Sequence, residues 1–404
     1  MIVASNRQNT FMHRLVLSLW LISSLGSVAG ASGSQPDPLS EPGFQHFYNL
    51  EYDKAIDAFT HKAAANPSDP TAYNQIAQSV LFQAMFANGA LESDVISASD
   101  PLVSRPKLPV TEVQRTLFEN AIGHAITLSQ TRLDANSRDA RAMYTMGVAF
   151  GLRANWNYVV HKAWIDPLRD ATQARKLHTH ATEIDPNFMD AFLVQGVHDY
   201  LVGSLPMAMK MVGFLAGFHG DREQGMRTLR KVYDGGSINR IDGAVLLSAI
   251  LRREKRQAQA VPLLEDVTSR FPRNYLFRYE LALLYADLGD RQKVSQQIDV
   301  IEKMRVNVSL PQERVDYMRG SALLFAQDVD GALLALTKAT AKTDNLNPMS
   351  AAQAWLRYGQ ALDMKGRRAE AVKAYRQAIQ MGPQTASAKD ARDYIGSRYK
   401  PKYS

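Results

Sequence analysis

The sequence predicts an all-α protein assembled from repeated helical hairpins. In residues 351–383, apolar side chains recur at helical spacing in two runs, which are separated by Gly366 and followed by Pro383. Each run places its apolar residues on one face of a helix: Trp355, Tyr358, Gly359 and Leu362 in the first, and Ala371, Tyr375 and Ala378 in the second. Units of this kind recur from Gly43 onward, and no stretch shows the alternating β-branched pattern of a strand.

Residues 351–383 also resemble a known repeat. Their order of large residue, small glycine, apolar residue, turn glycine, alanine, aromatic, alanine and proline resembles the tetratricopeptide repeat. One hairpin cannot bury its apolar face alone, so further copies are required. The resemblance implies a right-handed α-solenoid whose first helices line a concave groove, and this groove binds a peptide or an amphipathic helix of a partner protein.

The first 31 residues predict a secretory signal peptide. Arg7 and Arg14 form a basic start, residues 15–25 are apolar, and Ala29-Gly30-Ala31 matches a cleavage site. We therefore expect cleavage after Ala31 and a periplasmic or secreted protein, against the alternative of an uncleaved anchor. Residues 32–42 are rich in Gly, Ser and Pro and predict a flexible leader. The absence of cysteine excludes disulfides and thiolate metal sites.

The composition is that of an ordinary globular protein, with 46% hydrophobic and 22% charged residues among 404. The formal net charge is +7, but basic residues are interspersed with acidic ones, so we expect no nucleic-acid partner. The only basic-aromatic cluster is at residues 398–403. We interpret it as a solvated tail, with contact to an anionic surface as the alternative.

Residues 43–132 predict N-terminal hairpins that carry an inserted loop at 87–109. This loop contains Pro101, Pro106 and Pro109 and has low helical content. Long loops in compact arrays are uncommon and often functional, so the loop is a candidate contact surface, and a disordered excursion is the equal alternative. Helical periodicity resumes at Thr111, which forms a capping box with Gln114 in this interpretation.

Residues 133–236 predict irregular central units with two departures from the repeat. The first is an aromatic extension where a normal copy turns: Arg153, Trp156, Tyr158, His161 and Trp164. The second is the almost wholly apolar stretch 201–218, which follows Tyr200. Its glycines and Pro206 argue against a membrane span, so burial is favoured over shallow membrane contact or a lipid-lined groove. Gly147, residues 156–164 and residues 217–229 also resemble the tetratricopeptide repeat protein 39 and inclusion-body-clearance group.

Residues 237–383 predict regular units, and residues 384–404 a capping helix with a basic tail. We expect about seven complete or degenerate hairpins, followed by this C-terminal capping helix. The resemblance places the groove-facing positions of the last copy at Gln353, Leu356, Arg357, Gln360 and Asp363, and Tyr279 in an earlier copy.

Two regions are the candidate partner-binding sites. The central region is favoured by its Trp, Tyr and Arg residues, which are enriched at interface hot spots: Arg153, Trp156, Tyr158, His161, Trp164 and Tyr200. The groove adds Tyr279, Leu356, Arg357 and Gln360. The alternative is that the rings pack the junction between repeats, because aromatic residues on helical faces are most often core.

No catalytic motif is present. The sequence contains no phosphate-binding glycine loop, no H-E-x-x-H and no G-x-S-x-G. His178 and His180 with Glu183 resemble a ligand cluster, but two residues at i and i+2 point to different faces, so surface positions are expected. The sequence thus predicts a non-catalytic scaffold or adaptor of the cell envelope without metal or cofactor; the alternative is a lipid-binding or membrane-surface protein using 201–218. Its oligomeric state stays open.

Overall fold

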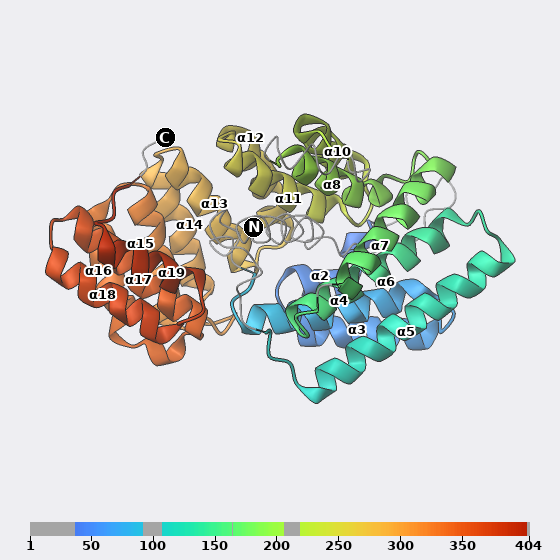
Figure 1. The fold of residues 1–404 in the computed structure, drawn as a ribbon, viewed down its shortest axis with the longest axis horizontal. Coiled ribbons are helices and arrows are strands. Elements are labelled where there is room, and N and C mark those ends of the chain that lie inside the picture. Colours follow the sequence, from blue (N-terminus) through green and yellow to red (C-terminus); the bar gives the residue numbers. More distant parts are fainter. Residues whose placement is uncertain (1–36, 92–106, 164, 206–218, 402–404) are drawn as a thin grey trace, which may run out of the picture. The chain divides into compact units, whose positions relative to one another are not determined.

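The computed structural model describes residues 37–91, 107–163, 165–205 and 219–401, and their regular structure is entirely helical (Figure 1). The described chain contains 17 α-helices and three 3-10 helices. The first nine α-helices are α2 (Pro42–Tyr48), α3 (Tyr52–Ala65), α4 (Pro70–Ala87), α5 (Glu112–Ala135), α6 (Ala140–Val159), α7 (Ile165–Ile184), α8 (Leu193–Gly203), α10 (Arg222–Gly235) and α11 (Arg240–Arg253). The other eight are α12 (Gln257–Arg270), α13 (Tyr275–Asp287), α14 (Arg291–Met304), α15 (Gln312–Phe325), α16 (Val329–Ala341), α17 (Pro348–Met364), α18 (Arg368–Met381) and α19 (Ala386–Gly396).

The predicted all-α class is confirmed. The three 3-10 helices are short: η1 (Pro38–Ser40), η4 (Met189–Phe192) and η5 (Thr343–Asn345). η1 lies in the predicted leader and buries Leu39. The predicted signal peptide and most of the apolar stretch 201–218 lie outside the described residues. Within the described part, no helix combines the length and hydropathy that a bilayer crossing needs.

The chain divides into two compact units. The N-terminal unit comprises residues 1–84 and 107–250, and the C-terminal unit residues 85–106 and 251–404. The described start of the predicted inserted loop therefore belongs to the C-terminal unit. There the Phe86 ring lies 6.2 Å from the Tyr275 ring, and Gly89 lies against the side chain of Asn347. The domain limits predicted at residues 132 and 236 stay predictions.

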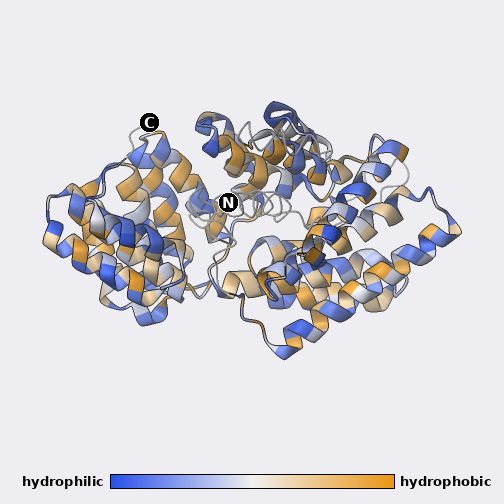
Figure 2. Cartoon of the chain, in the orientation of Figure 1, coloured by the Kyte–Doolittle hydropathy of each residue, from blue (hydrophilic) through white to orange (hydrophobic). Residues whose placement is uncertain are grey.

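Consecutive helices pack pairwise in chain order, as in a solenoid of helical hairpins. About seven hairpins were expected. Seven such pairs lie within one unit or the other in the described chain: α2/α3, α4/α5, α6/α7, α8/α10, α13/α14, α15/α16 and α17/α18. The boundary between the units falls within α11, and α12 follows it. Hydrophobic and hydrophilic residues alternate along the helices, as expected for helices that bury one face (Figure 2).

One contact recurs inside the hairpins: a glycine of the first helix faces a large side chain of the second. In regular hairpins the partners are sixteen residues apart in sequence: Gly43 with Phe59, Gly320 with Leu336, and Gly359 with Tyr375. The central hairpins keep the contact at a longer separation, in Gly147 with His178 and Gly196 with Leu229. The predicted extension of the central units is therefore an insertion between two preserved contact positions.

Gly225→Ala is expected to destabilise the N-terminal unit by about 1–3 kcal/mol, because extra volume at a close-packed contact forces the backbone to shift. A Cβ atom at Gly225 meets the amide nitrogen of Tyr200 and stands 2.6 Å from the carbonyl oxygen of Gly196. Urea unfolding followed by circular dichroism measures the change. The matched control is Gly123→Ala on α5, where a Cβ meets nothing within 4 Å. This control is expected to stabilise by about 0.5–1 kcal/mol, and equal effects of the two variants contradict the prediction.

The predicted helix ends are confirmed at two sites. Thr111 and Gln114 form the capping box at the start of α5. Thr385 caps α19, the expected C-terminal helix, by accepting from the Ala388 amide. Arg398 is exposed, as the prediction of a solvated tail requires, but residues 398–399 also bond to the end of α17. Arg398 Nε donates to the Asp363 carbonyl oxygen over 2.9 Å, and the Tyr399 amide donates to Asp363 Oδ2 over 3.0 Å. The acceptors at the end of α17 hold the start of the tail.

Candidate partner-binding site

Most residues that the sequence predicts as partner contacts are packed inside the protein. Six are at most 3% exposed: Trp156, Tyr158, Tyr200, Tyr279, Leu356 and Gln360. Arg153 and Arg357 are half-buried and His161 is exposed, while Trp164 lies outside the described residues. The structure also separates the two predicted groups, because Arg153, Trp156, Tyr158, His161 and Tyr200 belong to the N-terminal unit and the other four described residues to the C-terminal unit. Burial of the six favours the alternative interpretation, in which the rings pack between helices.

The described residues of the aromatic extension contribute in particular to packing between helices. Trp156 on α6 stacks on Phe118 of α5, with ring centroids 4.1 Å apart and planes inclined by 10°. Arg153 makes two hydrogen bonds of 2.8 Å to Asp170 on α7, which raise the pKa of the guanidinium, and it lies 4.8 Å from the centroid of the Phe150 ring. These contacts join α6 to both of its neighbours along the chain, so they stabilise the extended hairpin.

In the C-terminal unit, residues at the predicted groove positions bond to each other. Tyr317 on α15 donates to Gln353 Oε1 on α17 over 2.9 Å, and Arg314 donates to Ser350 Oγ over 2.7 Å. Arg357 lies 4.6 Å from the centroid of the Phe325 ring and donates to Gln360. Neighbouring first helices therefore satisfy one another at these positions, and little of the side chains remains for a partner.

The prediction of a surface position is wrong for His178. This residue is 1% exposed, because it is the large side chain that faces Gly147 across the hairpin. Burial lowers the pKa of its imidazole to about 4, against a backbone hydrogen bond with Ala191 that raises it. The ring is therefore neutral at pH 7. His180 is exposed as expected, and no group of three His, Cys, Asp or Glu residues in the described chain is placed to hold a metal ion.

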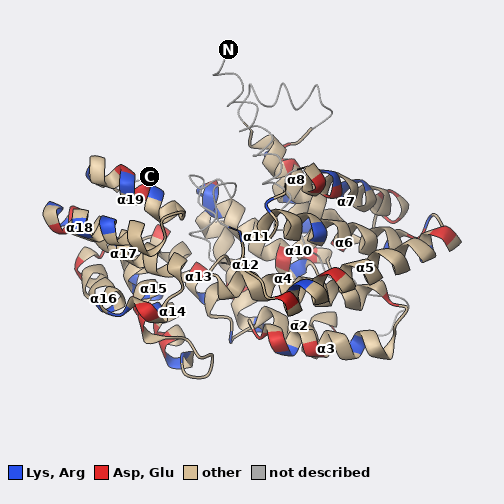
Figure 3. Cartoon of the chain, turned by 60° about the horizontal axis from the view of Figure 1, so that its bottom comes forward, with Lys and Arg blue, Asp and Glu red and all other residues tan. Residues whose placement is uncertain are grey.

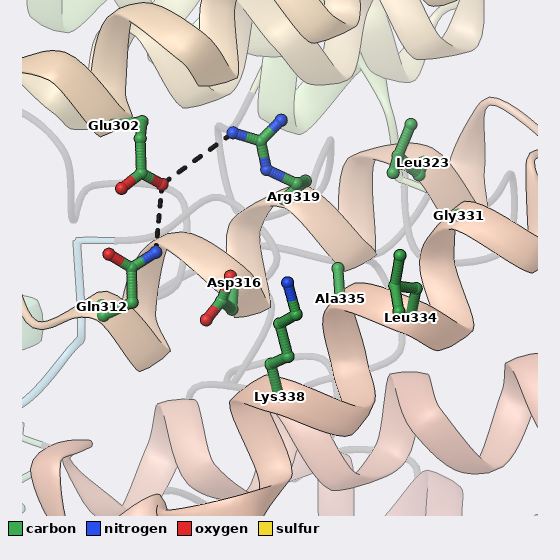
Figure 4. Close-up of a pocket in the computed structure, with 9 residues that line it drawn as sticks. All are labelled: Glu302, Gln312, Asp316, Arg319, Leu323, Gly331, Leu334, Ala335 and Lys338. Atoms are coloured by element: carbon green, nitrogen blue, oxygen red, sulfur yellow. Dashed lines mark hydrogen bonds and ion pairs between the residues drawn. The ribbon is translucent and has the colours of Figure 1, made fainter.

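The structure instead shows a hollow of ≈ 450 Å³ on the C-terminal unit (Figure 4). α14 and α16, the second helices of consecutive hairpins, line it together with α15. We call this space the hollow, and nine residues line it: Glu302, Gln312, Asp316, Arg319, Leu323, Gly331, Leu334, Ala335 and Lys338. None of them was predicted, because the sequence argument placed the groove on the first helices.

At the hollow, one repeat carries charged residues where the next repeat carries rings. Gly320 on α15 and Gly359 on α17 occupy the same position of their hairpins, since each faces the second helix. Counting from these glycines, Trp355 and Tyr358 of α17 correspond to Asp316 and Arg319 of α15. Asp316 and Arg319 line the hollow, whereas Trp355 and Tyr358 pack against the core of the last repeat. Aligning the repeats by their glycines is the sequence signal that identifies this position.

Charged groups rim the hollow and apolar groups form its wall. Glu302 accepts from Gln312 over 3.0 Å and lies 3.9 Å from Arg319, whose other nitrogen bonds to Asp299 over 3.0 Å. Lys338 lies opposite Asp316, with their polar atoms turned toward each other (Figure 4). Burial raises the pKa of Asp316, against the lowering effects of Gln312 and Lys338.

The apolar wall carries an exposed leucine. Leu334 is 67% exposed, although it belongs to the large hydrophobic residues that usually seek burial. Elsewhere the helices of both units carry charges of both signs, interspersed in the view of Figure 3. Leu334 thus places an exposed apolar side chain beside the acidic and basic groups of the hollow.

Comparisons with known proteins place this region in a repeat family. Residues 317–386, which include most of α15 and the whole of α16, α17 and α18, match the family model described as Tetratricopeptide repeat. No sequence of a curated protein matches the chain.

Three solved structures match the chain at low sequence identity, with TM-scores below 0.5. The APC/C hetero-tetramer Cut9-Hcn1 is 12% identical over 89% of this chain and 57% of its own, with a TM-score of 0.48, so this chain spans little more than half of that length. YrrB, described as a TPR protein with an unusual peptide-binding site, is 15% identical over 66% and 97%, with a TM-score of 0.33. The human IFIT1 dimer with PPP-AAAA is 11% identical over 95% and 83%, with a TM-score of 0.43. The match to the family model assigns tetratricopeptide repeats to residues 317–386, and the general role of these repeats is protein–protein interaction.

Proposed function

We propose that the protein is a non-catalytic adaptor of the cell envelope that binds one segment of a protein partner at the hollow. The observation that supports it is that six of the nine lining residues of the hollow belong to the segment that matches the repeat family, with Leu334 exposed among them. An apolar side chain of the partner can cover Leu334 and Leu323. Charged side chains next to it in the partner can then pair with Lys338 and Asp316.

The cell-envelope location is part of the proposal and rests on the signal-like residues 1–31. The alternative function, lipid binding through residues 201–218, stays a prediction that flotation of the mature chain with liposomes decides. His161, exposed beside the extended hairpin, likewise stays a predicted contact.

A site-specific crosslink tests the hollow directly. The photo-crosslinker p-benzoylphenylalanine replaces Leu334 in the full chain within Gram-negative cells. The control replaces Leu288, which is 47% exposed at the end of α13 and does not line the hollow. We expect a discrete protein adduct at position 334 and none at 288. The mass of the crosslinked chain also shows whether residues 1–31 have been removed.

Leu334→Asp is expected to weaken binding of the identified partner by about 10-fold or more, the effect of losing an interface contact worth more than about 1.4 kcal/mol. Leu288→Asp is expected to leave the affinity unchanged. Calorimetric titration of the purified full chain measures both. Identical adducts at positions 288 and 334, or equal affinities of the two aspartate variants, contradict the proposed site.

A further inference from the structure

The N-terminal unit buries a carboxyl oxygen against a phenol that comes from the other end of the unit. Tyr48 on α2 donates its hydroxyl hydrogen to Asp242 Oδ1 on α11 over 3.1 Å, and the two residues are 194 positions apart in sequence. Tyr48 is 4% exposed. Asp242 is half-buried as a residue, yet its Oδ2 atom is buried and accepts no hydrogen bond from the described residues. This hydrogen bond joins the first hairpin to α11.

The surroundings of Asp242 contain a second carboxylate and no cation within ion-pair distance among the described groups. Asp190 on η4 accepts backbone hydrogen bonds of 3.0, 3.2 and 2.9 Å from Ser237, Ile238 and Asn239. Tyr144 on α6 accepts from the Asn239 side chain over 2.9 Å. The two cations of the region are engaged elsewhere: Arg240 with Asp37 at 3.8 Å, and Arg141 through electrostatic attraction to Asp190.

This environment favours the neutral form of Asp242. Burial raises the pKa of its carboxyl group to about 7, with the charge of Asp190 adding to the rise and the Tyr48 hydrogen bond opposing it. Burial likewise raises the pKa of Asp190 to about 6, against its three backbone donors. The pKa of Tyr48 is raised well above 10, so the phenol stays a donor. Ionised Asp242 is therefore a buried charge with a single donor.

We propose that the burial of Asp242 against Tyr48 is a proton-operated latch: α2 stays closed over the carboxyl group while that group is protonated, and ionisation favours opening, because the hydration that the buried carboxylate lacks outweighs its hydrogen bond with the phenol. The folded unit keeps this proton to a higher pH than the unfolded chain does. The contribution of Asp242 to the stability of the folded unit is therefore greatest below about pH 4. This contribution falls as the pH rises from there toward about 7. The direction is opposite to that of a carboxylate held in an ion pair.

Hydrogen exchange of the full chain between pH 5 and pH 8 tests the latch, after correction for the intrinsic rate. We expect protection of α2 and α11 in the wild type to fall on the order of 100-fold across this range, while α18 of the C-terminal unit serves as the internal reference. Asp242→Asn keeps the shape and cannot ionise, so its protection is expected to change far less with pH. A pH profile of Asp242→Asn that equals the wild-type profile overturns the proposal.

Tyr48→Phe separates the latch from a purely structural contact. The phenol favours the ionised carboxyl group, so its removal is expected to move the wild-type transition to higher pH; an unmoved transition contradicts the latch. If Asp242→Asn does not fold, infrared spectroscopy of the wild type replaces it. Because Asp190 is also partly protonated at pH 6, the band of Asp242 is recognised by its shift in Tyr48→Phe. We expect a protonated aspartic acid band at pH 6 that shifts in Tyr48→Phe and is lost by pH 9, and absence of any band that responds to Tyr48→Phe overturns the proposal.

Discussion

Trp156→Ala is expected to destabilise the N-terminal unit by about 3–5 kcal/mol, the range for removing a large ring from a core. The indole is 1% exposed and stacks on Phe118, so its removal leaves a cavity between α5 and α6. Urea unfolding followed by circular dichroism measures the change in free energy. We expect any loss of partner binding to follow this loss of stability.

His161→Ala is the control for Trp156→Ala. His161 belongs to the same predicted aromatic extension but is exposed, so its removal is expected to change the stability by less than about 0.5 kcal/mol. Loss of partner binding in Trp156→Ala with an unchanged urea midpoint contradicts the packing role. Such a result identifies Trp156 as a contact of the partner.

The helical architecture was predictable because it depends on local patterns. Apolar spacing, Gly366 and Pro383 mark the hairpins, and Thr111 with Gln114 marks a helix start that the structure confirms. These signals act within one or two turns of chain, so a single copy is enough to identify them.

The depth of burial was not predictable in the same way. Spacing says that Trp156 shares a helix face with its neighbours, but it does not say whether another helix covers that face. α6 packs against both α5 and α7 and buries residues around most of its circumference. Tryptophan and tyrosine are found in cores as well as at interfaces, so residue type could not decide between the two.

The hollow was not predicted from the sequence, for a different reason. One repeat carries charged residues there where the next repeat carries rings, and such a difference shows only when two repeats are compared position by position. Asp316 and Arg319 resemble ordinary surface residues until Trp355 and Tyr358 are placed beside them. Sites in repeat proteins of this kind are therefore expected where a copy departs from its neighbours at a ring position.

Asp363→Ala is expected to destabilise the last repeat and its capping helix by about 3–5 kcal/mol, the cost of breaking a buried ion pair by removing one partner. The Asp363 side chain is fully buried and joins three elements. Arg368 Nη1 donates to it over 3.0 Å, the Tyr375 hydroxyl over 2.8 Å, and the Tyr399 amide over 3.0 Å. The hydrogen bond to Asp363 and burial raise the pKa of Tyr375, so the phenol remains a donor at all physiological pH values.

Hydrogen exchange of α17, α18 and α19 measures this loss. The matched control is Glu370→Ala, which removes an exposed ion pair with Arg367 in the same repeat and is expected to leave protection unchanged. Because Arg368 also donates to the carbonyl oxygens of Tyr394 and Ile395 on α19, Asp363 orients the side chain that ties α18 to α19. Loss of Asp363 is therefore expected to release α19 first, and unfolding of α17 with α19 still protected contradicts this role for the carboxylate.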